Sequence, residues 1–318
     1  MKLDKFVLAI IAVVILAYFF PHPVRGQGGV ILGHISTAGI FLIFFFYAIR
    51  LSTEKIMLGL TNWRLHLLVQ SATFLLFPLI VMIFHPFIKT EEHEILWLGL
   101  FFMAAVPSTV SSSVVMVSIG KGNIPAAIFN ASVSGLAGVI ITPLWMGLFL
   151  QHADGGYDFT VIYFRLFISI ILPVIVGLAM RRMLYSFAMK HLRELARFDK
   201  SVILLIIFIS FANSFNEDVF GSLHFIDLGL LVIIVIGLFH LVYGLIYGVS
   251  SILGLNREDR ITALFCGSNK SLVHGTVFSS VLFAGFHAAG LVLVPLMLFH
   301  AWQIFITSIF AARYGRSA

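Results

Sequence analysis

The stretch FCGSNKSLVHG, Phe265–Gly275, places a run of small polar residues and one lysine, Lys270, inside a long and otherwise mostly apolar segment. That segment covers about residues 261–283, which is the length that a helix needs to cross a bilayer. A charged residue near the middle of such a helix is costly and tends to mark a functional path. The sequence therefore predicts a membrane-spanning helix that is interrupted around Lys270.

The composition requires a lipid environment for the whole chain. Of 318 residues, 60% are hydrophobic and only 11% are charged, and the mean hydropathy is +1.06. A water-soluble domain with a polar outer shell cannot have these values. No stretch is left over for a separate soluble domain, so we expect an all-α integral membrane protein.

Charged, glycine-rich and proline-rich breaks divide the chain into ten expected transmembrane helices. They lie near residues 6–21, 29–49, 65–84, 95–120, 124–150, 161–180, 201–215, 226–249, 261–283 and 289–312. The first has the charged start and apolar core of a signal peptide but ends in Pro21, His22 and Pro23 rather than in small residues, so we expect it to be retained.

The positions of the basic residues support this even number of spans. With both termini in the cytoplasm, the inner segments hold most of the 20 Lys and Arg residues: Lys2, Lys5, Arg50, Lys55, Arg64, Lys121, Arg181, Arg182, Lys190, Arg193, Arg197, Lys200, Arg257, Arg260, Arg313 and Arg316. The outer loops hold Arg25 and Lys89, and the acidic Glu91, Glu92, Glu94, Asp154, Asp158, Glu217 and Asp218. A missed helix would destroy this positive-inside pattern. The predicted location is the cell's inner (plasma) membrane.

Several functional classes are excluded by the same residues. The net charge of +6 comes from the inner loops, so it does not indicate a nucleic-acid partner. The single cysteine, Cys266, excludes an intramolecular disulfide, and no zinc-ligand spacing is present. No HExxH, Gly-x-Ser-x-Gly or intramembrane carboxylate pair exists, so we expect neither an enzyme nor a cofactor or metal. Ser111–Ser113 with Lys270 and His274 could imitate a Ser-Lys dyad, but polar pocket lining is the better interpretation.

A second polar run, VPSTVSSSVV at Val106–Val115, lies in the fourth expected helix as Phe265–Gly275 lies in the ninth. Pro107 lacks an amide donor and Gly267 weakens a helix, so both helices are expected to break. Because five helices cannot return the chain to its starting side, two similar sets of five must be inverted repeats. Corresponding breaks in both halves indicate a binding site at the membrane midplane.

The broken helices favour an anionic substrate. Their half-helix N-termini and the charge of Lys270 would attract an anion. The alternative is that Lys270 is uncharged, because burial disfavours its charged form, and that it hydrogen-bonds the backbone carbonyls that the break leaves free.

The candidate pocket comprises the polar residues of the two breaks and of neighbouring helices. They are Ser108, Thr109, Ser111, Ser112, Ser113, Ser268, Asn269, Lys270, Ser271 and His274, with Gln70, Asn130, His300 and Gln303. Gln70 and Asn130 could equally join helices to one another, and His274 could relay protons. Arg165, at the outer end of the sixth helix, is expected to reach the membrane interface with its side chain. The connector 181–200 is either an amphipathic surface helix or a solvated linker.

Four segments resemble the bile acid:sodium symporter (BASS) superfamily, and in particular its divergent YfeH-like branch related to sodium/bile acid cotransporter seven. They are NWRLHLLVQSATFLLFP (62–78), GNIPAAIFNASVSGLAGVIITPL (122–144), FCGSNKSLVHG (265–275) and VPLMLFHAWQI (294–304). Their joint occurrence in order is specific, and the resemblance covers essentially the whole chain.

The resemblance implies an architecture of ten helices in two inverted repeats. The first repeat would cover residues 1–150. Helix 6 and a cytoplasmic connector would cover residues 151–200, and the rest of the second repeat would cover residues 201–318. Helices 1, 2, 6 and 7 would form a panel domain and helices 3–5 and 8–10 a core domain, with discontinuous helices 4 and 9 crossing in the core. Substrate would bind between panel and core and cross by alternating access.

The sodium ligands of these relatives are changed in the fourth and fifth helices. The relatives read PGGxxSN in the fourth helix, whereas here Pro107 precedes STVSSS, which puts Ser113 in place of the asparagine. Ala127 and Ala131 fall where the relatives carry hydroxyl ligands.

The ninth helix changes in the same direction. The relatives read ETGxQN there, so Phe265 replaces the glutamate, Asn269 the glutamine and Lys270 the asparagine. A lysine ammonium would repel sodium, so we expect Lys270 to replace the sodium charge and bound sodium to be absent. The expected function is sodium-independent transport of a small organic anion. The alternatives are a sodium-coupled, bile-acid-like symporter and a non-transporting membrane regulator of ion homeostasis; the sequence leaves the oligomeric state open.

Overall fold

The computed structural model describes residues 5–50, 62–88, 90–109, 111–150, 159–221 and 224–316. Over these residues all regular elements are helices. Of the residues used to predict the orientation, Lys2, Lys55, Lys89, Asp154 and Asp158 lie outside the description, as do the side chains of Glu91 and Glu92. The side chain of the candidate pocket residue Ser111 also lies outside it.

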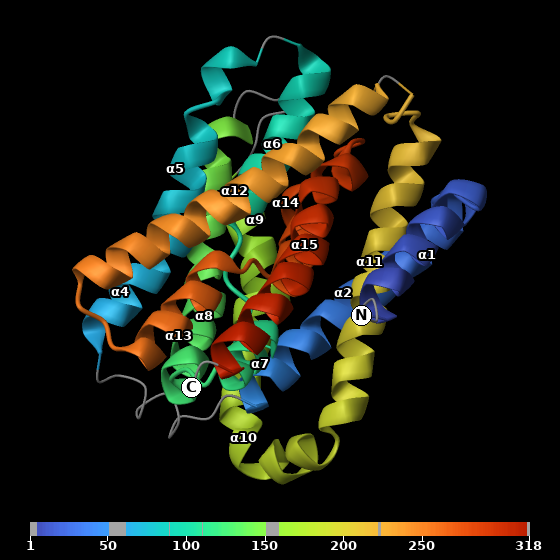
Figure 1. Ribbon diagram of the computed structural model, residues 1–318. Coiled ribbons are helices and arrows are strands. Elements are labelled where there is room, and N and C mark those ends of the chain that lie inside the picture. Colours follow the sequence, from blue (N-terminus) through green and yellow to red (C-terminus); the bar gives the residue numbers. More distant parts are fainter. Residues whose placement is uncertain are drawn as a thin grey trace. The chain divides into compact units, whose positions relative to one another are not determined.

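Each expected span is helical in the structure (Figure 1). The helices are α1 Lys5–Phe19, α2 Gly26–Arg50, α4 Trp63–Ser71, α5 Phe77–Met82, α6 Glu91–Ala105, α7 Ser111–Ile119, α8 Ile124–Leu150, α9 Phe159–Leu166, α10 Leu172–Lys190, α11 Leu192–Asn216, α12 Phe225–Ile252, α13 Arg257–Ser268, α14 Leu272–Leu282 and α15 Ala289–Arg316. Among the described residues, six helical segments are long and apolar enough to cross a membrane, and α1 and His93–Ala105 are shorter apolar helices. The chain is an all-helical, multi-pass membrane protein.

Two of the spans contain a π-helical turn that the sequence did not predict. One, η3 Ala72–Leu76, joins α4 to α5, and the other, η5 Phe167–Ile171, joins α9 to α10. Each turn is followed by a proline, Pro78 or Pro173, near the start of the next helix. In a regular α-helix the proline ring clashes with the carbonyl four residues earlier, and the wider π turn accommodates it.

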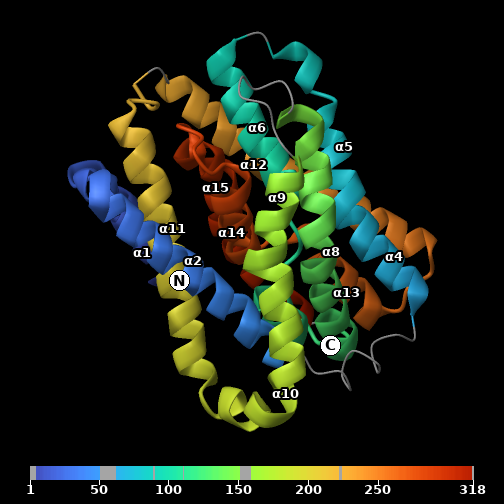
Figure 2. The ribbon, with the colours of Figure 1, turned by 180° about the vertical axis from the view of Figure 1, so that it is seen from behind.

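One compact unit comprises the described residues of Met1–Leu51, Leu150–Ser222 and Thr276–Leu291. Within it α2 packs against α10 and α11, and α1 lies along α11, the blue and yellow helices of Figure 2. A Cβ atom on Gly177 would lie 2.4 Å from the carbonyl oxygen of Phe45, so only glycine allows α10 to approach α2 so closely. An ion pair between Arg50 and Asp199, 3.0 Å long, joins α2 to α11.

The expected connector over 181–200 is helical on both sides of a single residue. α10 continues to Lys190 and α11 begins at Leu192, so that only His191 lies between them. Two of its apolar residues, Ala188 and Leu195, pack with Ile49 of α2 in a small buried cluster.

The second compact unit comprises the described residues of Ser52–Phe149, Leu223–Gly275 and Val292–Ala318. Its central element is α13, which contacts α4, α7 and α12. Nine of its twelve residues are buried, including Asp259 and Thr262. The candidate pocket residues of the sequence all belong to this unit.

Candidate functional site at two helix interruptions

The fourth span breaks where Pro107 predicts it. Helix α6 ends at Ala105, and Val106 adopts an extended conformation with φ −71° and ψ 152°. The residue before a proline avoids the helical region for steric reasons. The helix therefore stops, and the carbonyl groups of its last turn have no partners within the helix.

The ninth expected span breaks one residue after Gly267. Helix α13 ends at Ser268, Asn269 is extended with φ −88° and ψ 145°, and α14 starts at Leu272. The hydroxyl of Ser271 accepts a 3.2 Å hydrogen bond from the backbone N–H of His274 and lies 2.9 Å from its ring Nδ1. Ser271 and His274 thus begin the new helix, a role for His274 that the sequence did not suggest.

The two interruptions bind each other through their backbones. The N–H of Ser271 donates to the carbonyl of Pro107 at 2.9 Å. The hydroxyl of Ser108 donates to the carbonyl of Cys266 at 2.6 Å. Ser113 then accepts from the side-chain amide of Asn269 at 3.1 Å and donates to Phe265 at 3.1 Å. Groups that the breaks leave free are in this way paired across the two segments.

Lys270 completes this pairing from the centre of the site. Its side chain is fully buried, and its Nζ donates to the carbonyls of Thr73 at 2.7 Å, Ala104 at 2.5 Å and Val106 at 3.0 Å. The ring of Phe77 lies 4.3 Å from the same nitrogen, at cation–π distance. An ammonium has three hydrogens to donate, so all three are used by backbone carbonyls.

These carbonyls come from the irregular parts of two neighbouring spans. Ala104 and Val106 lie at the broken end of α6, and Thr73 lies in the π-helical turn η3. We call these three oxygens and the Phe77 ring the carbonyl cage. The alternative interpretation of Lys270 expects these carbonyl contacts.

Gln303 holds the backbone of Lys270 in place. Its side chain accepts from the N–H of Lys270 at 2.7 Å and donates to its carbonyl at 2.8 Å. Gln303 also lies 3.0 Å from the Nδ1 of His300, one turn earlier in α15. Two predicted pocket residues thus support the interruption.

Gln70 and Asn130 join helices to one another. Gln70 of α4 donates to the backbone carbonyl of Asn130 in α8 at 3.0 Å, and Asn130 contacts the Nδ1 of His66 at 2.9 Å. Ser268 bonds back to Leu264 within its own helix at 2.6 Å. These contacts are the interhelical and intrahelical bonds expected of polar groups in a membrane protein.

Three predicted pocket residues, Thr109, Ser112 and Asn269, differ from the residues whose contacts are described above. Thr109 is buried in the unwound segment after α6. Among the described residues, the buried Oγ of Ser112 and Oδ1 of Asn269 have no hydrogen-bond partner. The side chain of Ser111 lies outside the described part. Buried acceptors without partners are unusual, and they make the interruptions a polar location that is not fully satisfied.

Sequence reasoning missed a polar cluster around Asp259, which we call the asparagine cluster. The carboxylate of Asp259 accepts from the side-chain amides of Asn62 at 2.7 Å, Asn123 at 2.8 Å and Asn256 at 3.1 Å. Each asparagine also accepts from a backbone N–H three residues later. The only sequence signal was an asparagine before three helices, which is a common N-cap.

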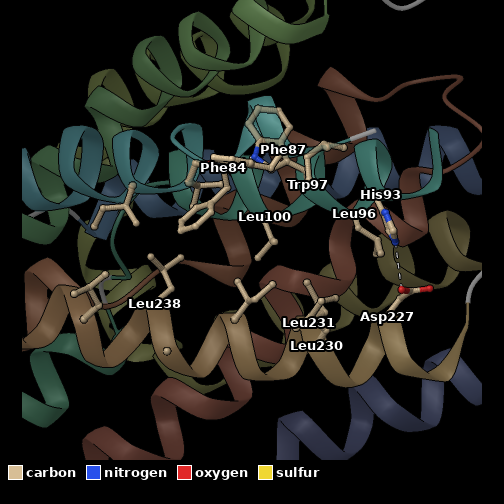
Figure 3. Close-up of a pocket in the computed structure, with 16 residues that line it drawn as sticks. Phe84, Phe87, His93, Leu96, Trp97, Leu100, Asp227, Leu230, Leu231 and Leu238 are labelled. Carbon is tan, nitrogen blue, oxygen red and sulfur yellow. Dashed lines mark hydrogen bonds and ion pairs between the residues drawn. The ribbon is translucent and has the colours of Figure 1, made fainter. Parts of the chain in front are cut away.

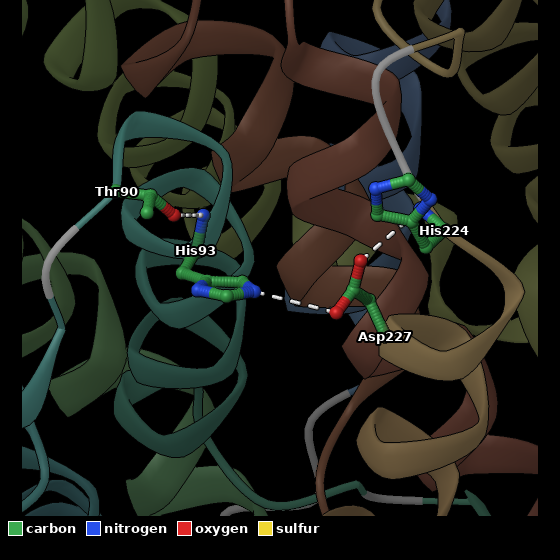
Figure 4. A network of polar contacts seen from close by, with 4 residues as sticks. All are labelled: Thr90, His93, His224 and Asp227. Atoms are coloured by element: carbon green, nitrogen blue, oxygen red, sulfur yellow. Dashed lines mark hydrogen bonds and ion pairs between the residues drawn. The ribbon is translucent and has the colours of Figure 1, made fainter.

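An apolar groove lies in the same unit, and Lys270 is not among the residues that line it. Its walls come from α5, α6 and α12, with Leu96 and Trp97 facing Leu231 and Leu238 (Figure 3), and its volume is about 460 Å³. At one end His93 and Asp227 approach to 3.3 Å. The backbone N–H of His93 donates to Thr90 and that of His224 to Asp227, so the pair lies at two helix starts (Figure 4).

Comparisons with known proteins match the whole chain. The family model described as SBF-like CPA transporter family (DUF4137) matches residues 4–316. "Uncharacterized protein PA2026" of Pseudomonas aeruginosa is 36% identical over 98% of this chain and 93% of its own length. "Putative symporter YfeH" of Escherichia coli is 34% identical over 99% and 93%. "Sodium/bile acid cotransporter 7" of Xenopus tropicalis is 29% identical over 97% and 91%.

Proposed function

Because the chain belongs to the SBF-like CPA transporter family, it is a transporter and not an enzyme, and we propose that it moves an organic anion by alternating access without sodium coupling. The family supplies the general activity. The substrate class and the coupling are inferred from the site.

The observation that carries the proposal is the carbonyl cage around Lys270. Backbone carbonyls are the kind of ligand that binds an alkali cation in place of its hydration shell. Here the ammonium of Lys270 occupies the three oxygens of Thr73, Ala104 and Val106. A sodium ion would have to compete for these oxygens and would meet a like charge at short range.

The resemblance to sodium-coupled relatives supports the same conclusion. Their glutamate position holds Phe265, and two hydroxyl-ligand positions hold Ala127 and Ala131. All three side chains are fully buried and apolar, so none can offer an oxygen to an ion.

An anion would be attracted by the charge of Lys270 rather than bound by its hydrogens, since all three are used. The N-termini of α7 and α14 add partial positive charge on the same interruptions. The unpaired Ser112 Oγ and Asn269 Oδ1 are the groups in the interruptions that could still bind a ligand. We therefore keep the predicted residues as the proposed pocket, with Lys270 as a fixed charge within it.

The proposed architecture is ten spans in two inverted repeats, divided into panel and core. The division into compact units supports it, because one unit contains α1, α2 and α9–α11 and the other contains α4–α8, α12, α13 and most of α15. Residues 276–291 are the exception, since they group with the proposed panel helices. We place both termini in the cytoplasm and the protein in the plasma membrane.

The test compares purified protein in sodium and in potassium. We expect equal thermal stability in the two salts, and saturable uptake of an organic anion into proteoliposomes that does not change when potassium replaces sodium. A sodium-specific gain in stability of the wild type that disappears in Lys270→Ala would show the proposal to be wrong.

A second candidate is a sodium-coupled symporter, which the name of the Xenopus relative favours. It makes the opposite prediction in the same experiment. Uptake would stop without a sodium gradient, and the wild type would be more stable in sodium.

A further inference from the structure

A second cavity lies entirely within the first compact unit, and a cationic side chain without a partner among the described residues lines it. It has a volume of about 790 Å³ and is lined by α2, by the α9–α10 segment, by α11, and by the end of α14 with the turn that follows. This volume is within the range of small-molecule sites in proteins. Arg165 contributes to its wall.

Arg165 is an exposed cation near one end of a membrane-spanning segment. Arg165 lies two residues after the start of the apolar segment Tyr163–Lys190. Its guanidinium has no ion pair or hydrogen bond among the residues that the structure describes. A cation near lipid that simply reaches the interface needs no cavity, whereas Arg165 lines one.

Ser279 gives an independent indication of a ligand in the same cavity. It lines the wall from α14, and its side chain is only 1% exposed. Within the described part of the chain its Oγ has no hydrogen-bond partner. A buried hydroxyl without a partner costs free energy unless a ligand or water completes it.

Most of the other polar groups of the wall are uncharged and can form hydrogen bonds. Hydroxyl and amide groups come from Ser36, Thr37, Ser169, Ser210, Asn213 and Ser280, and the remaining titratable groups are Glu217 and His287. Glu217 forms no ion pair with Arg165 in the structure, so the carboxylate can accept hydrogen bonds from a ligand. The wall thus offers one guanidinium that can bind an anion, and many groups that can form hydrogen bonds with the hydroxyls of a ligand.

We propose that this cavity is a recognition site for a hydroxylated organic acid, with Arg165 binding the acidic group and Ser279 and Glu217 binding hydroxyls. The inference rests on the proposed function and makes it specific. Lys270 has no hydrogen free to donate to a substrate, so the cation that hydrogen-bonds the acidic group directly is Arg165. A guanidinium suits carboxylate, sulfonate and sulfate groups because it can donate two parallel hydrogen bonds.

The test measures the charge preference of the cavity without needing the substrate. In a Cys266→Ser background, which removes the single cysteine, Ser279→Cys is labelled with a sulfonate-bearing or a trimethylammonium-bearing methanethiosulfonate of similar size. We expect the sulfonate reagent to be favoured, and Arg165→Gln to lower its rate relative to the cationic reagent by about tenfold. Ser280→Cys, also in the wall, provides a second reporter.

Two controls separate a local site from the general field of the protein. Arg165→Lys retains the charge and should retain most of the preference. Arg25→Gln removes the same charge from a residue outside the wall, whose guanidinium donates to Asn216, and should leave the preference unchanged. Equal ratios in wild type and Arg165→Gln, or no reaction at either reporter, would overturn the inference.

The labelling result is independent of transport. If uptake is absent but the Arg165-dependent preference is present, the proposed function fails and the anion site remains. If uptake occurs and Arg165→Gln changes neither the preference nor the KM, the site is wrong and the transporter remains.

Discussion

At the scale of single residues, Lys270 replaces interactions that the broken helix cannot make itself. Helix ends in a membrane have no water to satisfy their carbonyls, so another group must do so. The ammonium pairs with two carbonyls of the broken α6 end and with one of the π-helical turn. One side chain therefore stabilises two irregular segments that a regular helix would not contain.

Lys270→Ala should destabilise the protein by at least about 3 kcal/mol, because it leaves three buried carbonyls without partners. The vacated carbonyl cage should then accept a cation. We expect sodium, compared with choline, to raise the melting temperature of Lys270→Ala and to leave that of the wild type unchanged. Thermal unfolding in both salts measures this.

Lys270→Met is the matched control for this rescue. It fills the volume of the aliphatic chain, so it should be destabilised while leaving less space for an ion. An equal sodium effect on the alanine variant, the methionine variant and the wild type would contradict the cage.

The Arg50–Asp199 pair offers a pH-dependent prediction outside the apolar spans. Burial raises the pKa of the Asp199 carboxyl, and Arg50 only partly offsets the rise. Because the pKa of Asp199 is higher in the folded state than in the unfolded state, its contribution to stability is fully present below the unfolded pKa, where the carboxyl is protonated. This contribution is lost as the pH rises through the folded pKa. Removing Arg50 removes the compensation.

Arg50→Ala should therefore lose about 1–3 kcal/mol at pH 7 and recover part of it as the pH is lowered toward 5. Arg50→Ala with Asp199→Asn should lose less at pH 7 and show no such recovery. Melting temperatures of the wild type and both variants across this range test it. A double variant that melts as low as the single one would contradict it.

At the scale of elements, the asparagine cluster joins the starts of three helices. Asn62 precedes α4, Asn123 precedes α8 and Asn256 precedes α13, and each donates to the Asp259 carboxylate. Each also uses its oxygen to cap its own helix. One carboxylate therefore aligns three helix ends that lie far apart in the sequence.

Asp259→Ala should cost about 2–3 kcal/mol, since it removes the buried carboxylate that accepts hydrogen bonds from three side-chain amides. Glu258→Ala is the matched control, because it removes the same charge from the exposed neighbouring residue and should change stability by less than about 0.5 kcal/mol. Asn62→Ala, which removes one donor and one cap, should lie between them at about 1 kcal/mol. Equal melting temperatures for the Asp259 and Glu258 variants would refute the role of the cluster.

The helices and their breaks could be predicted from the sequence because their causes are local. Pro107 excludes its own amide from a helix and restricts Val106, and Gly267 lies in the last turn of the helix before the second break. The partners of the polar side chains could not be predicted. An asparagine before a helix indicates a cap, but the direction of its free amide depends on helices more than a hundred residues away.

The same dependence on residues distant in the sequence explains why the role of Lys270 could not be decided from the sequence. Its mid-membrane position follows from the length of one apolar segment, whereas its acceptors come from residues 73, 104 and 106. The sequence was therefore compatible with both an anion-binding role and a carbonyl-binding role for Lys270. Only the contacts distinguish hydrogens that are used from hydrogens that are available.

At the scale of the whole molecule, the apolar surface and the distribution of charge together predict its orientation. Large apolar side chains such as Phe225, Ile226 and Ile233 on α12 are exposed, as expected where a helix faces lipid. The basic residues of the α10–α11 junction include Arg193, and the acidic residues after α11 include Asp218. The positive-inside rule therefore predicts Arg193 on the cytoplasmic side and Asp218 on the outer side.

A single-cysteine experiment tests this orientation. In the Cys266→Ser background, Asp218→Cys should react with an impermeant maleimide added to intact cells, whereas Arg193→Cys should react only after the membrane is opened. Both positions are exposed and follow or begin the same helix, α11, so they differ in side and not in burial. Reversed reactivity would invert the proposed topology and place the cavity with Arg165 at the opposite membrane face, and reaction of both positions in intact cells would mean that α11 does not cross the membrane.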